Sequence, residues 1–234
     1  MSLLERTLPL IGEEGIEKLN NARVIVFGVG GVGSWCAEAL VRSGIGSITV
    51  VDADTVSESN RNRQLIALNS NIGKPKAVVC SERLSDINEN CKIQAVELFY
   101  SKDTADQIDL TQFDYIADCI DTVTSKLLLI SKAKELNIPI ISSMGTGNRL
   151  DPSKLTVTDI YSTVGDPLSR VMRKELRARK VESLKVVCSL EQAGECCEGR
   201  NPVTGRATPS SAVFVPATAG LRMAYEIVKE ILNG

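Results

Sequence analysis

A glycine cluster followed by a carboxylate is the stretch of this sequence whose residue types most directly suggest chemistry. The pattern Gly-x-Gly-x-x-Gly spans residues 28–33, directly after the apolar run 24–27. Glycine has no Cβ atom, so its backbone N–H groups can approach a phosphate, and a helix that begins there adds partial positive charge. Asp52 ends the next apolar run, where a carboxylate can bind ribose hydroxyls. We therefore predict a nucleotide site made by Asp52 and by the glycines Gly28, Gly30, Gly31 and Gly33.

The polar residues beyond this carboxylate indicate which kind of nucleotide binds. The glycine pattern alone favours NAD. Further polar and charged side chains follow, however, at Asp54, Asn60, Arg63, Gln64 and Lys76. Arginine can bind two phosphate oxygens at once and lysine neutralises charge on a leaving group, so this set fits a triphosphate better than a dinucleotide. Any one of these residues taken alone is most simply a solvated surface side chain, whereas the ordered set favours a site.

A later carboxylate is a candidate metal ligand. Asp121 follows the apolar run 115–118. Ligands of open α/β sheets bind at the carboxyl ends of the strands, and a carboxylate there could hold Mg²⁺ against phosphate oxygens. The sequence contains no histidine, which excludes Ser-His-Asp and Cys-His catalysis, HExxH zinc sites and dehydrogenases that use a histidine acid.

The elements that must position these residues alternate between strands and helices. Apolar runs predict strands at 23–27, 47–51, 115–118 and 140–143. An amphipathic segment predicts a further strand at 92–97, nearer the edge of the sheet, and residues 154–160 also predict a strand. Helical periodicity predicts helices at 31–44, 76–87, 124–136, 166–179 and 217–232, and Gly12 splits the N-terminal segment into two short helical pieces. This order is typical of an α/β fold with a Rossmann-like, doubly wound, mostly parallel sheet and helices on both faces. We expect a single domain over 1–234, with a mobile loop at about 189–210.

Composition limits the other classes of protein that this chain could belong to. Net charge is −2 and 43% of the residues are hydrophobic, which is ordinary for a globular protein. The seven cysteines are too sparse for a secreted disulfide scaffold. The uncharged run 24–37 is too short to span a membrane, and the N-terminal segment has no basic region typical of a signal peptide. We expect a reduced, cytoplasmic protein without a membrane partner.

Four motifs carry a resemblance to a known family. GVGGVGSW, VVDADTVSESNRNRQ, NIGKPKA and DCIDT, in this order, resemble the adenylating family of ubiquitin-activating enzymes, MoeB, ThiF and HesA. The resemblance implies a Rossmann-like ATP-binding domain, usually a homodimer, that adenylates a carboxylate with MgATP and releases pyrophosphate. It further implies that Asp52 binds the ribose, that Asn60, Arg63 and Lys76 bind the phosphates, that Asp121 holds Mg²⁺ and that Arg6 reaches the ATP of the partner subunit.

Longer phrases resemble one branch of that family, the tRNA threonylcarbamoyladenosine dehydratases. These phrases are GVGSWCAEALVRSGIGSITVVD, KAVVCSERLSDIN and GTGNRLDPSKLTVTDIYSTVGDPLSRVMRKELR. The branch activates the carboxylate of threonylcarbamoyladenosine at position 37 of tRNA, and loss of AMP then gives a cyclic form. Members of the ThiF and MoeB kind instead adenylate the Gly-Gly end of a small sulfur-carrier protein and typically carry two CxxC zinc pairs. This chain has none, so we expect no structural zinc.

Two further features bear on the substrate. Between residues 170 and 185 there are seven Lys or Arg and two Glu, and Arg170, Arg173, Lys174 and Arg177 are candidate tRNA contacts, although a basic helix can simply be a solvated face. Cys188 is a candidate reactive thiol, with structural burial as the alternative. Two other functions stay open: adenylation of a sulfur carrier, with a cysteine desulfurase or another sulfur-transfer protein as partner, and a NAD-dependent oxidoreductase or nucleotide sensor.

Overall fold

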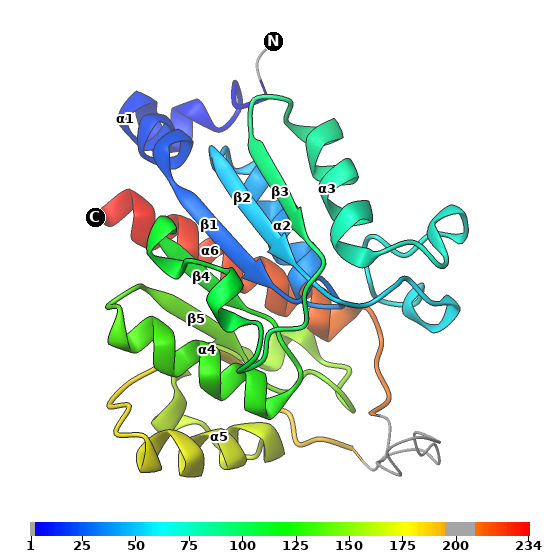
Figure 1. The fold of residues 1–234 in the computed structure, drawn as a ribbon, viewed down its shortest axis with the longest axis vertical. Coiled ribbons are helices and arrows are strands. Elements are labelled where there is room, and N and C mark those ends of the chain that lie inside the picture. Colours follow the sequence, from blue (N-terminus) through cyan, green and yellow to red (C-terminus); the bar gives the residue numbers. More distant parts are fainter. Residues whose placement is uncertain (1–2, 195–208) are drawn as a thin grey trace.

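One seven-stranded sheet is the centre of the fold (Figure 1). The computed structural model describes residues 3–194 and 209–234. The strand order is β3-β2-β1-β4-β5-β7-β6, and only the pairing of β6 with β7 is antiparallel. The strands are β1 (Arg23–Phe27), β2 (Ser47–Val51), β3 (Lys92–Val96), β4 (Tyr115–Asp118), β5 (Ile140–Ser143), β6 (Leu155–Asp159) and β7 (Lys185–Ser189).

Helices cover both faces of this sheet, because its central strands are apolar on both sides. In β1, Val24 and Val26 belong to one hydrophobic cluster, while Ile25 and Phe27 belong to a second one. The first cluster includes side chains of α1 (Leu8–Asn21), α2 (Gly33–Arg42), α3 (Lys76–Ile87) and α6 (Phe214–Asn233). The second includes side chains of α4 (Val123–Glu135) and α5 (Pro167–Ala178). The predicted doubly wound, mostly parallel fold is therefore confirmed (Figure 1).

Most differences from the predicted elements concern the second half of the chain. Strand β7 was not predicted, and its last residue, Ser189, was assigned to the loop expected at 189–210. Most of that loop, together with Cys196 and Cys197, lies outside the described residues. Helix α6 begins at Phe214, three residues before the predicted start. The predicted interruption at Gly12 is confirmed, since its backbone is non-helical within α1. Within 3–194 and 209–234, no helix has the length and hydropathy that crossing a bilayer requires.

The turn between β1 and α2 is tightly packed. Gly28 has a φ of 82° and donates its N–H to the carbonyl of Val51, 2.7 Å away. Gly33, at the start of α2, lies so close to Gly28 that an added Cβ would be 1.7 Å from the Gly28 carbonyl oxygen. At that distance the turn and the helix could not keep their positions, so glycine is required there for packing.

We expect Gly33→Ala to lower the free energy of unfolding by at least about 2 kcal/mol, since the new methyl group must displace backbone. Gly30→Ala is the matched control. A Cβ at Gly30 would lie 3.7 Å from Gln64 Nε2, which is an ordinary contact, so its cost should stay below about 1 kcal/mol. Urea denaturation followed by circular dichroism measures both values. Equal stability of the two variants would contradict the close approach.

Candidate functional site

A cleft of about 590 Å³ opens at the carboxyl edge of the sheet, where ligands of such folds bind. Its walls come from the ends of β1, β2, β4 and β5 and from the segments that follow them. Nine of the predicted site residues line it: Gly28, Gly30, Gly31, Asp52, Asp54, Arg63, Gln64, Lys76 and Asp121. The structure thus brings together side chains from four separate parts of the chain.

Asp52 holds the glycine turn and faces the cleft at the same time. One carboxylate oxygen accepts the N–H of Val29 at 2.8 Å, and the other accepts the N–H of Asp54 at 2.9 Å. Burial raises the pKa of Asp52, although both hydrogen bonds and the charge of Lys76 act in the opposite direction. A carboxylate that is desolvated to this extent gains from further donors, and ribose hydroxyls are donors of that kind.

Two cations, Lys76 and Arg63, line the cleft. The side chain of Lys76 is 8% exposed, and its Nζ lies 2.7 Å from Asp54 Oδ2. Arg63 donates to the carbonyl of Ser59 at 3.0 Å and to the side chain of Asn62, and burial lowers the pKa of its guanidinium. Among the described residues, no carboxylate lies within ion-pair distance of Arg63. A bound phosphate would supply the missing counter-charge.

Asn60 and Gln64 differ in their placement. Asn60 is buried and lies outside the cleft lining, and its Oδ1 accepts the N–H of Ser57 at 3.0 Å. Its carbonyl accepts the N–H groups of Arg63 and Gln64, so it positions those residues. Gln64 lines the cleft, and its buried Oε1 has no hydrogen-bond partner among the described residues. An unpaired buried amide oxygen is unfavourable, and a ligand donor at this point would satisfy it.

A buried ion pair that the sequence analysis missed supports Asp121. Lys126 Nζ lies 2.9 Å from Asp118 Oδ2, and both side chains are fully buried. The ammonium also donates to the carbonyl of Ile120 at 3.0 Å, while Asp118 Oδ1 accepts the N–H of that residue. Asp121 itself is exposed at the cleft and accepts a hydrogen bond from Thr122 Oγ1. The available signal was Lys126, a charge directly before the apolar residues 127–130 of the same helix.

The comparisons with known proteins agree with this geometry. The model of the ThiF family matches residues 4–233. The tRNA threonylcarbamoyladenosine dehydratase of Bacillus subtilis is 40% identical over 95% of this chain and 92% of its own length. The chain belongs to the ThiF family. The solved Escherichia coli dehydratase in complex with ATP has a TM-score of 0.88 and 33% identity, covering 97% of this chain and 93% of that one.

A relative that matches a smaller part of the chain is named as an enzyme that acts on a protein. The sulfur carrier protein adenylyltransferase of Thermus thermophilus is 34% identical over 57% of this chain. The resemblance to this adenylating family is therefore confirmed, and the similarity to the dehydratases extends over more of the chain. Within the described ranges, no three His, Cys, Asp or Glu side chains are grouped as a metal cluster would require.

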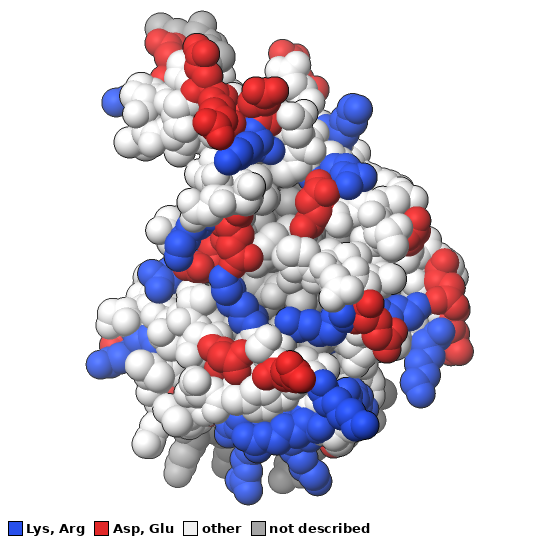
Figure 2. All heavy atoms as spheres, turned by 90° about the vertical axis from the view of Figure 1, so that its left-hand side faces the viewer, with Lys and Arg blue, Asp and Glu red and all other residues white. Residues whose placement is uncertain are grey.

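The remaining predicted residues lie apart from the cleft of this ThiF-family chain. Arg6 is exposed in the turn before α1, so a role at a nucleotide requires a second subunit and stays a prediction. On α5, Arg170, Lys174 and Arg177 are exposed, and Figure 2 shows Lys and Arg gathered at the end of the molecule where α5 lies in Figure 1. Arg173 is half-buried and donates to the carbonyl of Thr163 at 2.8 Å.

Cys188 lies within β7, opposite Thr156 of β6. It is 1% exposed, and burial raises the pKa of its thiol. The carboxylate of Asp166 acts in the same direction, while Arg149 opposes it. Only the thiolate is a good nucleophile, so this environment favours the structural alternative for Cys188.

We expect Cys188 to resist iodoacetamide in the folded protein, because the reagent cannot reach it and its thiolate is scarce. Labelling should be on the order of 100-fold slower than in urea, which corresponds to reaction only through local opening. Peptide mass spectrometry measures the labelled fraction, and the same protein denatured in urea is the control. Rapid labelling of Cys188 in the native state would restore the reactive-thiol hypothesis.

Proposed function

We propose that this chain is an ATP-dependent tRNA threonylcarbamoyladenosine dehydratase. The observation that carries the proposal is the 40% identity to a named dehydratase over nearly the whole of both chains. It is supported by a cleft that presents a carboxylate, two cations and a glycine turn, as ATP requires. Adenylation of a sulfur carrier is the weaker candidate, because similarity to the named sulfur-carrier enzyme covers a smaller part of the chain. A tRNA substrate is consistent with the cytoplasmic location that we expect.

We assign the parts of the nucleotide to different residues of the cleft. Asp52 would accept hydrogen bonds from the ribose, and the backbone of the glycine turn would face the phosphates. Arg63 and Lys76 would offset the charge that develops on the phosphates. Asp121 suits Mg²⁺, which is commonly bound through one or two carboxylates together with substrate phosphates, and the ion would neutralise the leaving pyrophosphate.

The reaction itself needs no protein nucleophile. The carboxylate of the modified adenosine attacks the α-phosphate of ATP, and the bond to pyrophosphate breaks. A nucleophilic group of the substrate then attacks the acyl-adenylate, loses its proton and releases AMP, so that the net change in the nucleoside is the loss of one water. The residues of the cleft orient the two substrates and stabilise charge.

The assembly is part of the same proposal. We propose a homodimer in which Arg6, exposed and outside its own cleft, reaches the nucleotide of the partner subunit. The surface of α5 would contact the phosphate backbone of tRNA through Arg170, Lys174 and Arg177. A cysteine desulfurase or another sulfur-transfer protein remains a candidate partner.

Incubation with ATP and with tRNA that carries threonylcarbamoyladenosine should convert the nucleoside to a product lighter by one water. Nucleoside mass analysis measures this change, which should require ATP. No conversion, together with ATP–pyrophosphate exchange stimulated by a carrier protein ending in Gly-Gly, would replace the dehydratase with the sulfur-carrier function.

Two neighbouring arginines provide a matched pair of variants for this assay. Arg63→Ala should reduce turnover at least about 100-fold, because it removes a cation from the phosphate end of the cleft. Arg61→Ala should leave turnover unchanged, since Arg61 pairs with Glu58 and does not line the cleft. Equal loss in both variants would show that the effect is not specific to the phosphate site.

Charge reversal on α5 should weaken tRNA binding and leave ATP binding unchanged. We expect Arg170→Glu, Lys174→Glu and Arg177→Glu combined to raise the Kd for tRNA at least about tenfold and to flatten its salt dependence. Filter binding at several salt concentrations measures both effects. The control reverses three exposed cations outside α5 and the cleft, namely Lys92, Lys102 and Arg222. If both triple variants bind tRNA like the wild type, α5 is only a solvated face.

A further inference from the structure

A second buried ion pair lies beside the cleft, on the side away from the predicted nucleotide residues. Arg149 Nη2 lies 2.9 Å from Asp166 Oδ1, and the two side chains are 2% and 1% exposed. Burying two charges costs free energy, which well-packed apolar residues of similar volume would avoid. The pair therefore calls for a role beyond the stability of the fold.

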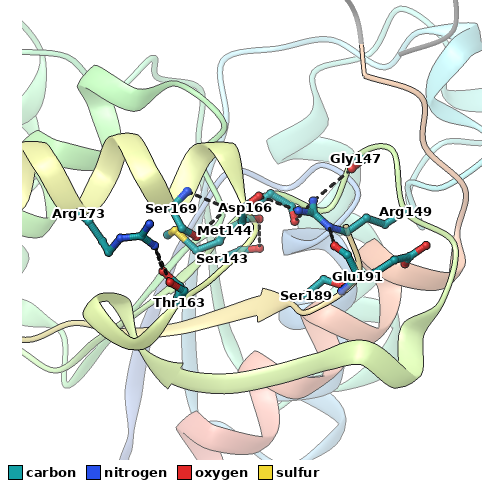
Figure 3. Close-up of polar contacts among 11 residues, drawn as sticks. Ser143, Met144, Gly147, Arg149, Thr163, Asp166, Ser169, Arg173, Ser189 and Glu191 are labelled. Carbon is teal, nitrogen blue, oxygen red and sulfur yellow. Dashed lines mark hydrogen bonds and ion pairs between the residues drawn. The ribbon is translucent and has the colours of Figure 1, made fainter. Parts of the chain in front are cut away.

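The guanidinium of Arg149 connects several segments of backbone. Nη1 donates to the carbonyl of Gly145 at 2.7 Å and to that of Gly147 at 3.2 Å. Nε donates to the carbonyl of Glu191 at 3.0 Å. Figure 3 shows Arg149 directed from the loop that carries Gly147 toward Asp166 at the start of α5. The planar fork of arginine can serve all these acceptors together, whereas the single ammonium of lysine cannot.

Asp166 fixes the other end of the connection. Its Oδ2 accepts the N–H and the hydroxyl of Ser169, at 2.7 and 2.6 Å, which caps the N-terminus of α5. The same oxygen accepts the N–H of Gly145 at 3.4 Å. A Cβ at Gly145 would lie only 2.5 Å from Asp166 Oδ1, so loop and helix are in direct contact. This carboxylate therefore connects the loop to the start of α5.

The loop held in this way is one wall of the cleft. Ser143, Met144, Gly145, Thr146 and Gly147 all line the cleft, and so does Leu168 on α5. The wall follows β5, which lies two strands from β1, or about 10 Å at ordinary strand spacing. The predicted ribose and phosphate ligands Asp52, Arg63 and Lys76 belong to segments that follow β2. The wall after β5 is therefore left for a second substrate.

We propose that the wall from Ser143 to Gly147 receives the acceptor end of the substrate, and that Arg149 and Asp166 are positioning residues that hold this wall in register with the basic helix α5. The inference rests on the proposed dehydratase function. A tRNA bound along α5 would then present its modified adenosine to a wall whose position relative to the helix is fixed. Neither residue touches the reacting atoms, so their effect is on alignment alone.

The decisive variant is Arg149→Lys, which keeps the positive charge but removes the planar guanidinium that contacts several acceptors at once. We expect kcat for dehydration to fall at least about tenfold and the KM for modified tRNA to rise, because a small misplacement of the acceptor slows the reaction strongly. The Kd for ATP should stay within about twofold of the wild type, since the nucleotide ligands are unchanged. Arg83→Lys is the matched control, because Arg83 bonds to buried Glu38 and does not line this cleft. It should lower Tm without changing kcat or KM.

Two further variants keep the test decisive. Asp166→Asn keeps the shape of the side chain that caps α5 but removes its charge. Like Arg149→Lys, it should lower kcat and raise the KM for modified tRNA while leaving the Kd for ATP unchanged. Thr146→Trp places a large side chain in front of the wall, and it should abolish dehydration while the affinity for ATP is retained. This variant tests the role of the wall even if the other two variants do not fold. Wild-type kinetics in the folded variants would overturn the inference. A wild-type enzyme that fails to dehydrate modified tRNA would instead overturn the proposed function.

Discussion

Carboxylates that accept backbone N–H groups hold the turns at the carboxyl edge of the sheet, and the cleft depends on this arrangement. Asp52 binds the N–H of Val29 and so joins the end of β2 to the glycine turn. Asp118 accepts the N–H of Ile120, the residue before Asp121, and Asp166 accepts the N–H of Gly145. Each turn is too irregular for strand or helix hydrogen bonds, so a side chain must satisfy its donors. The same bonds set the direction in which each turn faces the cleft.

Charge is distributed unequally between these supports and the cleft surface. Asp118 and Asp166 are each paired with a cation, so their charges are compensated inside the protein. Lys76 is paired with Asp54, whose side chain is 72% exposed, whereas Arg63 has no carboxylate at ion-pair distance within the described ranges. Among the described charged side chains that line the cleft, Arg63 is the cation that no carboxylate neutralises, so an anion would bind most favourably beside it. Nucleotide phosphates fit that requirement, and the proposed acceptor wall, residues 143–147, has no charged side chain.

The sequence predicted the first five strands to within one residue, because four of them are short apolar runs and β3 is a short amphipathic segment. It missed β7, which comes directly after a strongly basic stretch and before a segment rich in turn residues. It also missed Asp118, Lys126, Arg149 and Asp166 as supports of the site. Their contacts join residues far apart in sequence, such as Arg149 with the carbonyl of Glu191, and periodicity carries no information about such pairs. The predicted nucleotide ligands could be found in the sequence because they occur together in ordered motifs.

The basic helix shows how a chain with a net charge of −2 can still attract a polyanion. Arg173 is held by Thr163, and the guanidinium of Arg177 lies 5.0 Å from the centre of the Tyr161 ring, so part of the positive charge is fixed in place. Fixed cations lose less side-chain entropy on binding than free ones. The rest of the chain carries a net negative charge and would repel tRNA, so the proposed docking would be directed toward α5. Because Asp166 joins that helix to the proposed acceptor wall, an orientation set by long-range charge would be passed on to the reacting group through these hydrogen bonds.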